Sequence, residues 1–438
     1  MAGCSPGRPC AGAADRRSAV RIEIVTIGDE LLLGYTIDTN AAHLARELAS
    51  LGVEIVRRST CGDDATEITQ TVREALDRSG AVITTGGLGP TSDDRTKPSI
   101  AALFGRGMRL DEVHLEWMRQ RWLNRWPDRP MPEANRQQAM IPEGAEKLRN
   151  NHGSAPGIWL EDERGRWVAM LPGVPREMRG MLADTLLPRI EARLGGERRV
   201  VRSRTLRSTG VAESLVAEKI ATIAGGVGDV ELAYLPNVDG VDLRATVRNA
   251  TVADADARLE QAASRLRTVL GDAVYGEGDT DLAAVVLDLS RARRITIAVA
   301  ESCTGGMLGE RLTAVPGSSD VMLGGVIAYD NAVKRSLLGV SEAMLVQHGA
   351  VSEEVSRAMA TGARRALKVE AALAITGIAG PGGGSADKPV GTVWLALDLQ
   401  GRTEAVLLRL WGDRQEIRQR SAQGALNLLR RALLSTSP

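Results

Sequence analysis

Two candidate nucleophiles lie side by side in the last third of the sequence. Ser302 and Cys303 follow the apolar run ITIAVA (295–300) and precede the glycine pair Gly305–Gly306. A strand that passes through a glycine turn into a helix directs backbone N–H groups toward a ligand, which suits a phosphate. A nucleophile needs a neighbouring base or a lowered pKa. The spacing therefore predicts a nucleophilic or phosphate-binding turn, with simple helix capping by Ser302 as the alternative.

The base at this turn is not expected to be a histidine. The four histidines are His43, His114, His152 and His348, and none of them lies in these motifs. A Ser-His-Asp triad therefore has no support. Tyr329 and Lys334 follow another strand-like run, and a buried lysine can lose its proton and act as a base. We interpret Ser302 as the nucleophile, assisted by Lys334 or Tyr329. Thr376 is the candidate orienting residue, and Cys303 is expected to be a small buried apolar side chain.

A second glycine-rich segment, TGIAGPGGG (376–384), also follows a strand-like run. Two such loops on one sheet suggest a site for a mononucleotide. The candidate binding residues are glycines of both loops and two arginines of the last helix: Gly305, Gly306, Gly377, Gly380, Gly382, Gly383, Arg414 and Arg418. The sequence does not decide which arginine meets a phosphate.

A different constellation, TTGGLGPTSDD (84–94), lies near the beginning of the sequence. Its glycines let backbone N–H groups approach an anion, and its paired acids can hold a hard divalent cation through oxygen. Such a metal beside a phosphate loop is typical of phosphoanhydride cleavage. The candidate metal ligands are Asp93 and Asp94, and the candidate substrate contacts are Gly86, Gly87, Gly89, Thr91, Lys97, Asp29 and Asn40. The alternative is a tight turn followed by an acid-capped helix.

Alternating strands and helices must position this first loop. Strand composition over 21–27, 53–58 and 81–85 alternates with helical patterns over 38–52 and 64–76. This alternation predicts a parallel sheet covered on both faces.

The rest of the chain divides into two further regions. Residues 186–272 read as a small α+β module with a strand at 241–247 and a helix at 252–271, and residues 278–436 read as a second α/β domain. The second domain's predicted strands are 295–300, 324–329, 371–376 and 391–398, and its closing helix is 414–433. With 21–185 as the first domain, residues 1–20 remain as a predicted disordered extension.

Composition limits the class of protein. The 438 residues are 43% hydrophobic, and 55 basic residues balance 55 acidic ones, so the excess of positive charge typical of nucleic-acid binders is missing. No apolar run approaches the roughly 18 to 20 residues of a membrane helix. The cysteines form no CxxC pair and no disulfide framework: Cys4, Cys10, Cys61 and Cys303. We expect a cytoplasmic protein in a reducing compartment.

The blocks TIGDELLLG, TTGGLGPTSDDRT, NHGSAPG and LPGVPREM resemble the amino-terminal domain of the competence/damage-inducible protein A (CinA) family. That domain is itself similar to molybdopterin-binding (MoaB/MogA-like) proteins of three-layer α/β fold. The resemblance implies hydrolysis of ADP-ribose to AMP and ribose 5-phosphate with Mg, Mn or Co, held by Asp93 and Asp94. It also keeps molybdopterin binding open. The block NRQQAMIP (135–142) departs from the common pattern, which more often has lysine before the second glutamine, and this puts substrate fit in doubt.

The blocks AESCTGG, YDNAVK, GAVSEEV and TGIAGPGGG resemble the carboxy-terminal CinA domain, which is similar to nicotinamide mononucleotide (NMN) deamidase. The resemblance implies hydrolysis of NMN to nicotinic acid mononucleotide and ammonia without a cofactor, and it favours the serine as the nucleophile. Together the domains imply a bifunctional enzyme of pyridine-nucleotide salvage. We expect a homodimer acting on small nucleotides, with no nucleic-acid or membrane partner. The alternative is a non-catalytic partner protein linked to competence or DNA damage.

Overall fold

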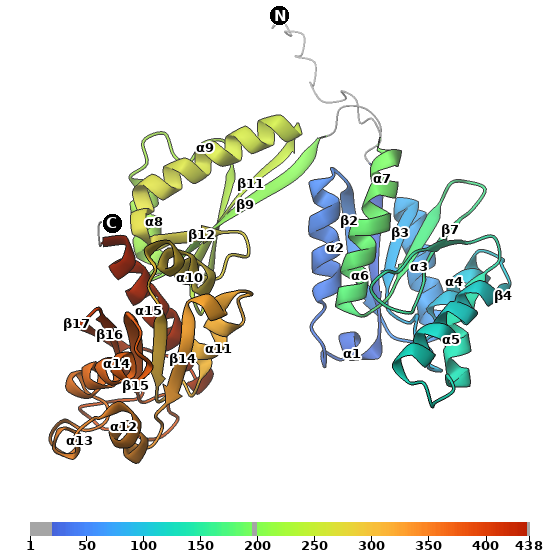
Figure 1. Cartoon of the computed structure of the whole chain (residues 1–438). Helices are drawn as coiled ribbons and strands as arrows, with labels where there is room; N and C mark the ends of the chain where they lie inside the picture. Colours follow the sequence, from blue (N-terminus) through green and yellow to red (C-terminus); the bar gives the residue numbers. More distant parts are fainter. Residues whose placement is uncertain (1–19, 195–198, 436–438) are drawn as a thin grey trace, which may run out of the picture. The chain divides into compact units, whose positions relative to one another are not determined.

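The computed structural model describes residues 20–194 and 199–435 of the chain. The described residues form two compact units, the first within 20–202 together with Arg248–Asp256, and the second Ser203–Val247 together with 257–435 (Figure 1). Apart from Val20, the predicted amino-terminal extension lies outside the described residues. Within the described ranges, no helix combines the length and the apolar character that a membrane span requires.

The first unit is built on a six-stranded sheet in the order β2-β1-β3-β8-β7-β6. The first four of these strands run parallel, whereas β7 and β6 are antiparallel additions at one edge. The strands predicted at 21–27, 53–58 and 81–85 are confirmed as β1, β2 and β3. The strand bounds are β1 Arg21–Ile27, β2 Glu54–Cys61, β3 Ala81–Thr85, β6 Glu146–Leu148, β7 Gly157–Glu161 and β8 Trp167–Leu171.

Both faces of this sheet are covered, as the alternation predicted. Side chains alternate across a strand, so Ile22 and Ile24 of β1 face one core and Val25 and Ile27 face the other. The first core also contains Ile190, in a segment that the sequence assigned to the connecting module. The helices on that face are α2 (Thr39–Ser50), α6 (Pro175–Met181), η2 (Leu182–Leu186) and α7 (Leu187–Arg193). The second face is covered by α3 (Ala65–Ser79) and α4 (Thr96–Leu103).

Five further elements complete the first unit. A two-stranded ribbon pairs β4 with β5 in antiparallel register. The elements are α1 (Asp29–Leu32), β4 (Met108–Leu110), α5 (Glu112–Arg125), η1 (Glu133–Ala139) and β5 (Met140–Pro142).

The second unit begins with a four-stranded sheet in the order β10-β11-β9-β12. Leu206, Val216, Leu243 and Leu266 fill the core between this sheet and its two helices. The predicted strand at 241–247 and helix at 252–271 are confirmed. The elements are β9 (Val200–Ser208), α8 (Glu213–Ala221), β10 (Glu231–Asn237), β11 (Gly240–Ala250), α9 (Val252–Leu270), η3 (Gly271–Ala273) and β12 (Val274–Glu277).

The remainder of the second unit is a five-stranded sheet in the order β14-β13-β15-β16-β17. The first three strands are parallel, and β16 and β17 return antiparallel. The sequence predicted all of these strands except β17. Their bounds are β13 Ile297–Glu301, β14 Met322–Ile327, β15 Ala371–Gly377, β16 Thr392–Leu399 and β17 Arg402–Arg409.

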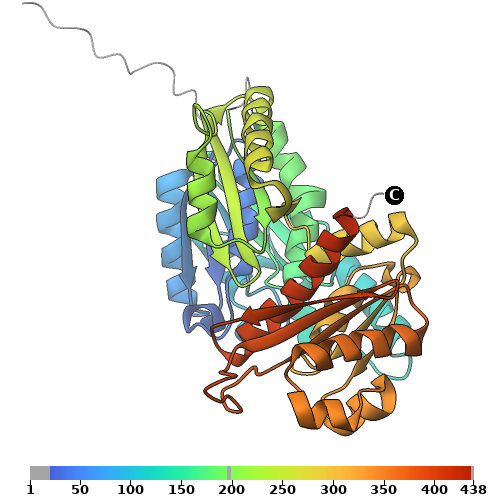
Figure 2. The ribbon, with the colours of Figure 1, turned by 90° about the vertical axis from the view of Figure 1, so that its left-hand side faces the viewer.

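Helices cover both faces of this sheet, and a hydrophobic core lies between the sheet and the helices on each face. Ala298 and Ala300 pack toward α14, whereas Ile297 and Val299 pack toward α10, α11 and α15. Figure 2 shows the ribbon of these helices on both sides of the sheet. The helices are α10 (Leu282–Arg293), α11 (Met307–Thr313), η4 (Ser318–Asp320), α12 (Asn331–Leu338), α13 (Glu342–His348), α14 (Glu353–Leu367) and α15 (Arg414–Ser435). Because β13, β14 and β15 are parallel, their carboxyl ends bring the predicted site loops to one edge of the sheet.

Candidate functional site

The turn that carries Ser302 lies at the carboxyl end of β13. The N–H of Ser302 donates to the carbonyl of Ile375 on β15 at 2.9 Å, which fixes the turn to the neighbouring strand. Gly305 and Gly306 then adopt φ of +58° and +98°, values that side-chain-bearing residues rarely adopt. The sheet therefore presents Ser302 on a tight turn, as predicted.

A buried carboxylate accepts hydrogen bonds from the backbone amides at the start of the helix that follows this turn. Glu301 is 1% exposed and accepts N–H groups from Gly306 at 3.0 Å, Leu308 at 3.1 Å and Gly309 at 2.8 Å. The expectation that these amides bind a phosphate is wrong, because their hydrogens already point at Glu301. Glu301 was not among the predicted site residues, because nothing in the sequence shows that its side chain turns toward these amides.

Lys334 lies buried on α12, beside the Ser302 turn. Its Nζ donates to the carbonyls of Ala328 at 2.8 Å and Tyr329 at 3.1 Å. Burial lowers the pKa of Lys334, while the charge of Asp330 opposes that shift. Ala328, which accepts from the amine, donates its own N–H to the carbonyl of Glu301 at 2.7 Å and so links the amine to the residue before Ser302. A buried lysine with a lowered pKa is suited to accept a proton.

Cys303 is a poor nucleophile in this environment. Burial raises the pKa of its thiol to about 11, and the charges of Arg414 and Arg418 reduce that shift only in part. Nucleophilic attack requires the thiolate, which is scarce near neutral pH at such a pKa. The geometry fits the interpretation of Cys303 as a buried apolar side chain.

Two arginines on the first turns of α15 link the loops of this site. Arg414 donates to the carbonyl of Gly380 at 2.6 Å and to the hydroxyl of Tyr329 at 3.1 Å. Arg418 donates to the carbonyl of Thr304 at 2.7 Å. The structure thus brings both predicted arginines to the same edge of the sheet. Their guanidinium groups retain further N–H donors for an anion.

Two other predicted residues have structural partners. The buried hydroxyl of Thr376 donates to the carbonyl of Ala350 at 2.8 Å, which ties β15 to the segment before α14. Tyr329 is 61% exposed, and its hydroxyl contacts Arg414. One residue that the sequence analysis missed lies here as well: the buried hydroxyl of Thr304 has no partner among the described residues.

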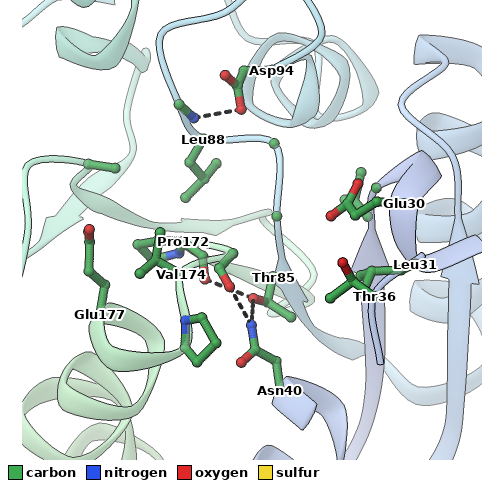
Figure 3. A pocket seen from close by; sticks show the side chains of 18 of the residues that line it. Glu30, Leu31, Thr36, Asn40, Thr85, Leu88, Asp94, Pro172, Val174 and Glu177 are labelled. Atoms are coloured by element: carbon green, nitrogen blue, oxygen red, sulfur yellow. Dashed lines mark hydrogen bonds between the residues drawn. The ribbon is translucent and has the colours of Figure 1, made fainter. Parts of the chain in front are cut away.

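The first unit has a cavity of about 480 Å³ at the carboxyl ends of β1 and β3 (Figure 3). Six of the predicted residues line it: Asn40, Gly86, Gly87, Gly89, Asp93 and Asp94. Gly86 has φ of +117°, and a Cβ there would lie 2.0 Å from the carbonyl oxygen of Ile27. The N–H groups of Gly87 and Leu88 have no acceptor among the described residues. Glycine thus permits the close approach that an anion-binding loop needs.

Asp94 shapes this loop from within. Its carboxylate accepts the N–H of Gly89 at 2.7 Å, the bond drawn at Asp94 in Figure 3. It also accepts the N–H of Thr91 at 2.8 Å and the hydroxyl of Thr91. Because the carboxylate already accepts these three hydrogen bonds, little of its hydrogen-bonding capacity remains for a ligand or a metal ion. Asp93, by contrast, is exposed at the cavity wall.

An acidic group that the sequence analysis had not assembled lies beside Asp93. Burial raises the pKa of Asp63, and the charges of Asp29, Glu30 and Asp93 raise it further, although a hydrogen bond from the Asp29 backbone opposes the shift. Carboxylate oxygens crowded in this way suit a hard divalent cation. Within the described part of the chain, however, no three acidic, histidine or cysteine side chains lie close enough to hold a metal alone. The described residues therefore do not form a complete metal site by themselves.

Three predicted contacts lie elsewhere. Lys97 is fully buried, and its Nζ donates to the carbonyls of Gln137 at 2.8 Å and Gln138 at 3.0 Å, so it does not line the cavity. Burial lowers the pKa of this lysine to about 8. Thr91 lines a neighbouring cavity, and Asp29 lies beside Asp63 rather than in the wall.

Two further wall residues, Glu30 and Glu177, come from sequence blocks that were recognised but not assigned, whereas Asn40 was predicted. Asn40 donates to Thr85 at 3.1 Å and to the carbonyl of Gly173 at 2.7 Å, which leaves its buried Oδ1 without a partner in the described ranges. Glu177, in the first turn of α6, and Glu30 approach the cavity from opposite sides (Figure 3). Asp63 follows β2, so the rule that ligands meet the carboxyl ends of parallel strands could have found it.

Known proteins match this chain over nearly its whole length. It is 62% identical to a CinA-like protein of Gemmatimonas aurantiaca over 411 residues, 94% of this chain and 96% of that one. It is 45% identical to a CinA-like protein of Gloeobacter violaceus, with the same coverages. A crystal structure of a competence/damage inducible protein from Agrobacterium tumefaciens is 41% identical and covers 35% of this chain and 94% of its own, with a TM-score of 0.34.

Three family models cover successive parts of the sequence. The model described as "Probable molybdopterin binding domain" matches residues 23–192. The "Damage-inducible protein CinA KH domain" matches residues 203–276, and the "CinA C-terminal domain" matches residues 279–433. The first unit is thus MoaB/MogA-like, and the multi-domain α/β architecture agrees with the prediction.

Proposed function

Since this chain belongs to the CinA family, we propose that it is a hydrolase of pyridine-nucleotide salvage whose second unit deamidates NMN. The observation that carries the proposal is the buried Lys334 amine, with its lowered pKa, beside the turn of Ser302. A serine hydroxyl needs such a base, and Lys334 meets that need where no histidine does.

In this mechanism Lys334 accepts the hydroxyl proton as Ser302 Oγ attacks the carboxamide carbon. The protonated lysine then returns the proton to the leaving nitrogen, so that ammonia departs and a serine ester remains. Water hydrolyses that ester and releases nicotinic acid mononucleotide. Arg414 and Arg418 bind the phosphate through their free N–H groups, because Glu301 occupies the amides of the glycine turn.

The experiment is ammonia release from NMN by the full chain and by two neighbouring variants. Ser302→Ala is expected to lose activity by about three orders of magnitude or more, while Cys303→Ala stays within a few fold. Loss in Cys303→Ala alone would reverse the assignment. A folded wild-type protein that releases no ammonia would refute deamidation.

For the first unit we propose metal-dependent hydrolysis of ADP-ribose to AMP and ribose 5-phosphate. The free N–H groups of Gly87 and Leu88 suit a phosphate, and the unpartnered oxygen of Asn40 suits a ligand hydroxyl or amine. Asp93 and Asp63 would hold a divalent ion, Mg, Mn or Co, which supplies charge stabilisation at the pyrophosphate. We also propose that the chain forms a homodimer, and light scattering of the purified protein tests this oligomeric state.

AMP formation from ADP-ribose tests this second activity. We expect turnover that EDTA abolishes and that Ser302→Ala leaves unchanged, which separates the two sites. Absence of AMP with each of the three metals would refute hydrolysis. A pterin that co-purifies with the chain would favour molybdopterin binding instead.

A further inference from the structure

Most backbone N–H groups of the turn that follows β13 have acceptors, and Thr304 is the exception. The N–H of Ser302 donates to β15, and that of Gly305 closes the turn on the carbonyl of Ser302 at 3.1 Å. The N–H of Gly306 donates to Glu301. Among the described residues, the N–H of Thr304 finds no acceptor. Since buried backbone donors are nearly always paired, this one needs an explanation.

Thr304 also has an unpartnered side chain. The residue is 0% exposed, and its hydroxyl has no hydrogen-bond partner in the part of the chain that the structure describes. The adjacent N–H of Cys303 bonds to the thiol of its own side chain. Thr304 thus offers two buried donors at one residue of the turn. A buried polar group of this kind destabilises the fold unless a ligand atom supplies the missing acceptor.

The surroundings of Thr304 indicate which ligand atom that is. Its carbonyl is fixed by Arg418 at 2.7 Å and by the N–H of Met307 at 3.3 Å, so the backbone of Thr304 is held in place before substrate binds. The residue lies two positions after Ser302, and both of its free donors are uncharged. Neutral, buried donors suit the oxygen of an uncharged carboxamide, on which negative charge develops only during attack. A phosphate carries its charge throughout, and burying it against uncharged donors alone is costly.

We propose that Thr304 is a further catalytic residue of the second unit, whose N–H and hydroxyl bind the oxygen of the substrate carboxamide. When Ser302 Oγ bonds to the carboxamide carbon, one electron pair of the C=O bond moves onto this oxygen, and the two donors stabilise its charge. The pair returns to the C=O bond as the C–N bond breaks and ammonia leaves with the proton from Lys334. This inference rests on the proposed deamidation of NMN and adds the group that stabilises its tetrahedral intermediate.

The test begins with ammonia release by the full chain and two variants of Thr304. Thr304→Val removes the hydroxyl and keeps both the N–H and the shape of the side chain. It is expected to lower kcat for NMN about 100-fold and to leave KM within about threefold, because the bond strengthens in the transition state. Thr304→Ser keeps a hydroxyl and should stay within about tenfold of wild type. Nicotinamide riboside, which has the carboxamide but no phosphate, should show the same fall in kcat.

Urea unfolding of the substrate-free proteins separates a catalytic role from a structural one. Because the hydroxyl has no partner in the described chain, Thr304→Val should raise the urea midpoint while it lowers kcat. Ser290→Ala is the matched control. The hydroxyl of Ser290 is also buried and unpartnered within the described ranges, but it lies on α10. Its removal should raise the midpoint and leave kcat unchanged.

Three results overturn the role of Thr304: a kcat of Thr304→Val within about threefold of wild type, a loss confined to NMN or to KM, or a lowered urea midpoint together with the lost activity. Each of them leaves deamidation by Ser302 standing. A folded wild-type chain that releases no ammonia would instead refute deamidation, and the role of Thr304 with it. The two proposals therefore fail in different ways.

Discussion

Two glycine loops of this chain, Gly86–Gly89 in the first unit and Gly305–Gly306 in the second, look alike in sequence and differ in their hydrogen bonds. Each follows a buried strand, and each lies next to a carboxylate that accepts backbone N–H groups. In the second unit Glu301 takes the helix amides, and two arginines remain for the anion. In the first unit Asp94 takes the amides of Gly89 and Thr91, and those of Gly87 and Leu88 stay free. A glycine loop thus predicts a phosphate cradle only when the neighbouring carboxylate points away from its amides.

The largest expected effect is at Lys334, the proposed base for NMN deamidation in the second unit. Lys334→Met is expected to lower kcat for NMN deamidation by about 10³-fold, within the usual range for removal of a general base. Because burial lowers the pKa of this lysine, the wild-type rate should rise with pH as the ammonium loses its proton and then level off. A full pH–rate profile of both proteins measures this.

Lys388→Met is the matched control for that variant. Its Nζ also donates to a backbone carbonyl, that of His348 at 2.9 Å, but this lysine belongs to the loop after β15. A Lys334→Met protein within tenfold of wild type, with the same pH profile, would contradict the assigned base.

The next largest effect is expected at Glu301, whose carboxylate accepts the backbone amides that follow the glycine turn. Glu301→Gln loses one acceptor oxygen and turns an NH₂ group toward a backbone N–H, which should cost about 2 kcal/mol of unfolding free energy. Urea unfolding followed by NMN activity measures it. The exposed Glu310→Gln on α11, the helix whose amides Glu301 accepts, should stay within about 0.5 kcal/mol, and an equal loss in both variants would refute the special role of Glu301.

A third pair of variants sharpens the contrast within the first loop. Asp93→Asn is expected to raise the metal concentration for half-maximal ADP-ribose hydrolysis about tenfold, because it removes a charged oxygen ligand. Asp94→Asn should instead weaken AMP binding in EDTA, because it releases the amides of Gly89 and Thr91. Metal titration and calorimetry separate the two effects. Identical behaviour of the two variants would show that the loop does not divide these roles.

The smallest effect is at Cys303. Since burial raises the pKa of its thiol to about 11, iodoacetamide should leave Cys303 unmodified near neutral pH in the folded chain. Cys61, whose thiol pKa burial also raises to about 11, provides the internal comparison. Mass spectrometry should find both labelled only after unfolding. Rapid labelling of Cys303 alone would mark it as a reactive thiol.

The sequence predicted the strands and loops of both sites better than the burial and hydrogen bonding of their charged residues. Strand patterns located β1, β3, β13 and β15, and glycine spacing located the loops that follow them. The burial of Lys97 depends on tertiary contacts with η1 that no local pattern encodes. The bonds of Glu301 to the start of α11 are local, but the residue pattern does not show that its side chain turns toward those amides. The antiparallel edge strand β17 was missed because its half-exposed residues lack the continuous apolar run of a buried strand.

The most direct test of the central contrast compares NMN with nicotinamide riboside, which lacks the phosphate. The ratio of their kcat/KM values should fall about 100-fold or more when Arg414 and Arg418 are both replaced by alanine, because two charged hydrogen-bond donors are lost. Arg420→Ala, on the same helix but stacked over Trp411, should leave the ratio unchanged. An unchanged ratio in the double variant would mean that the phosphate is bound elsewhere, and the account of the second loop would be wrong.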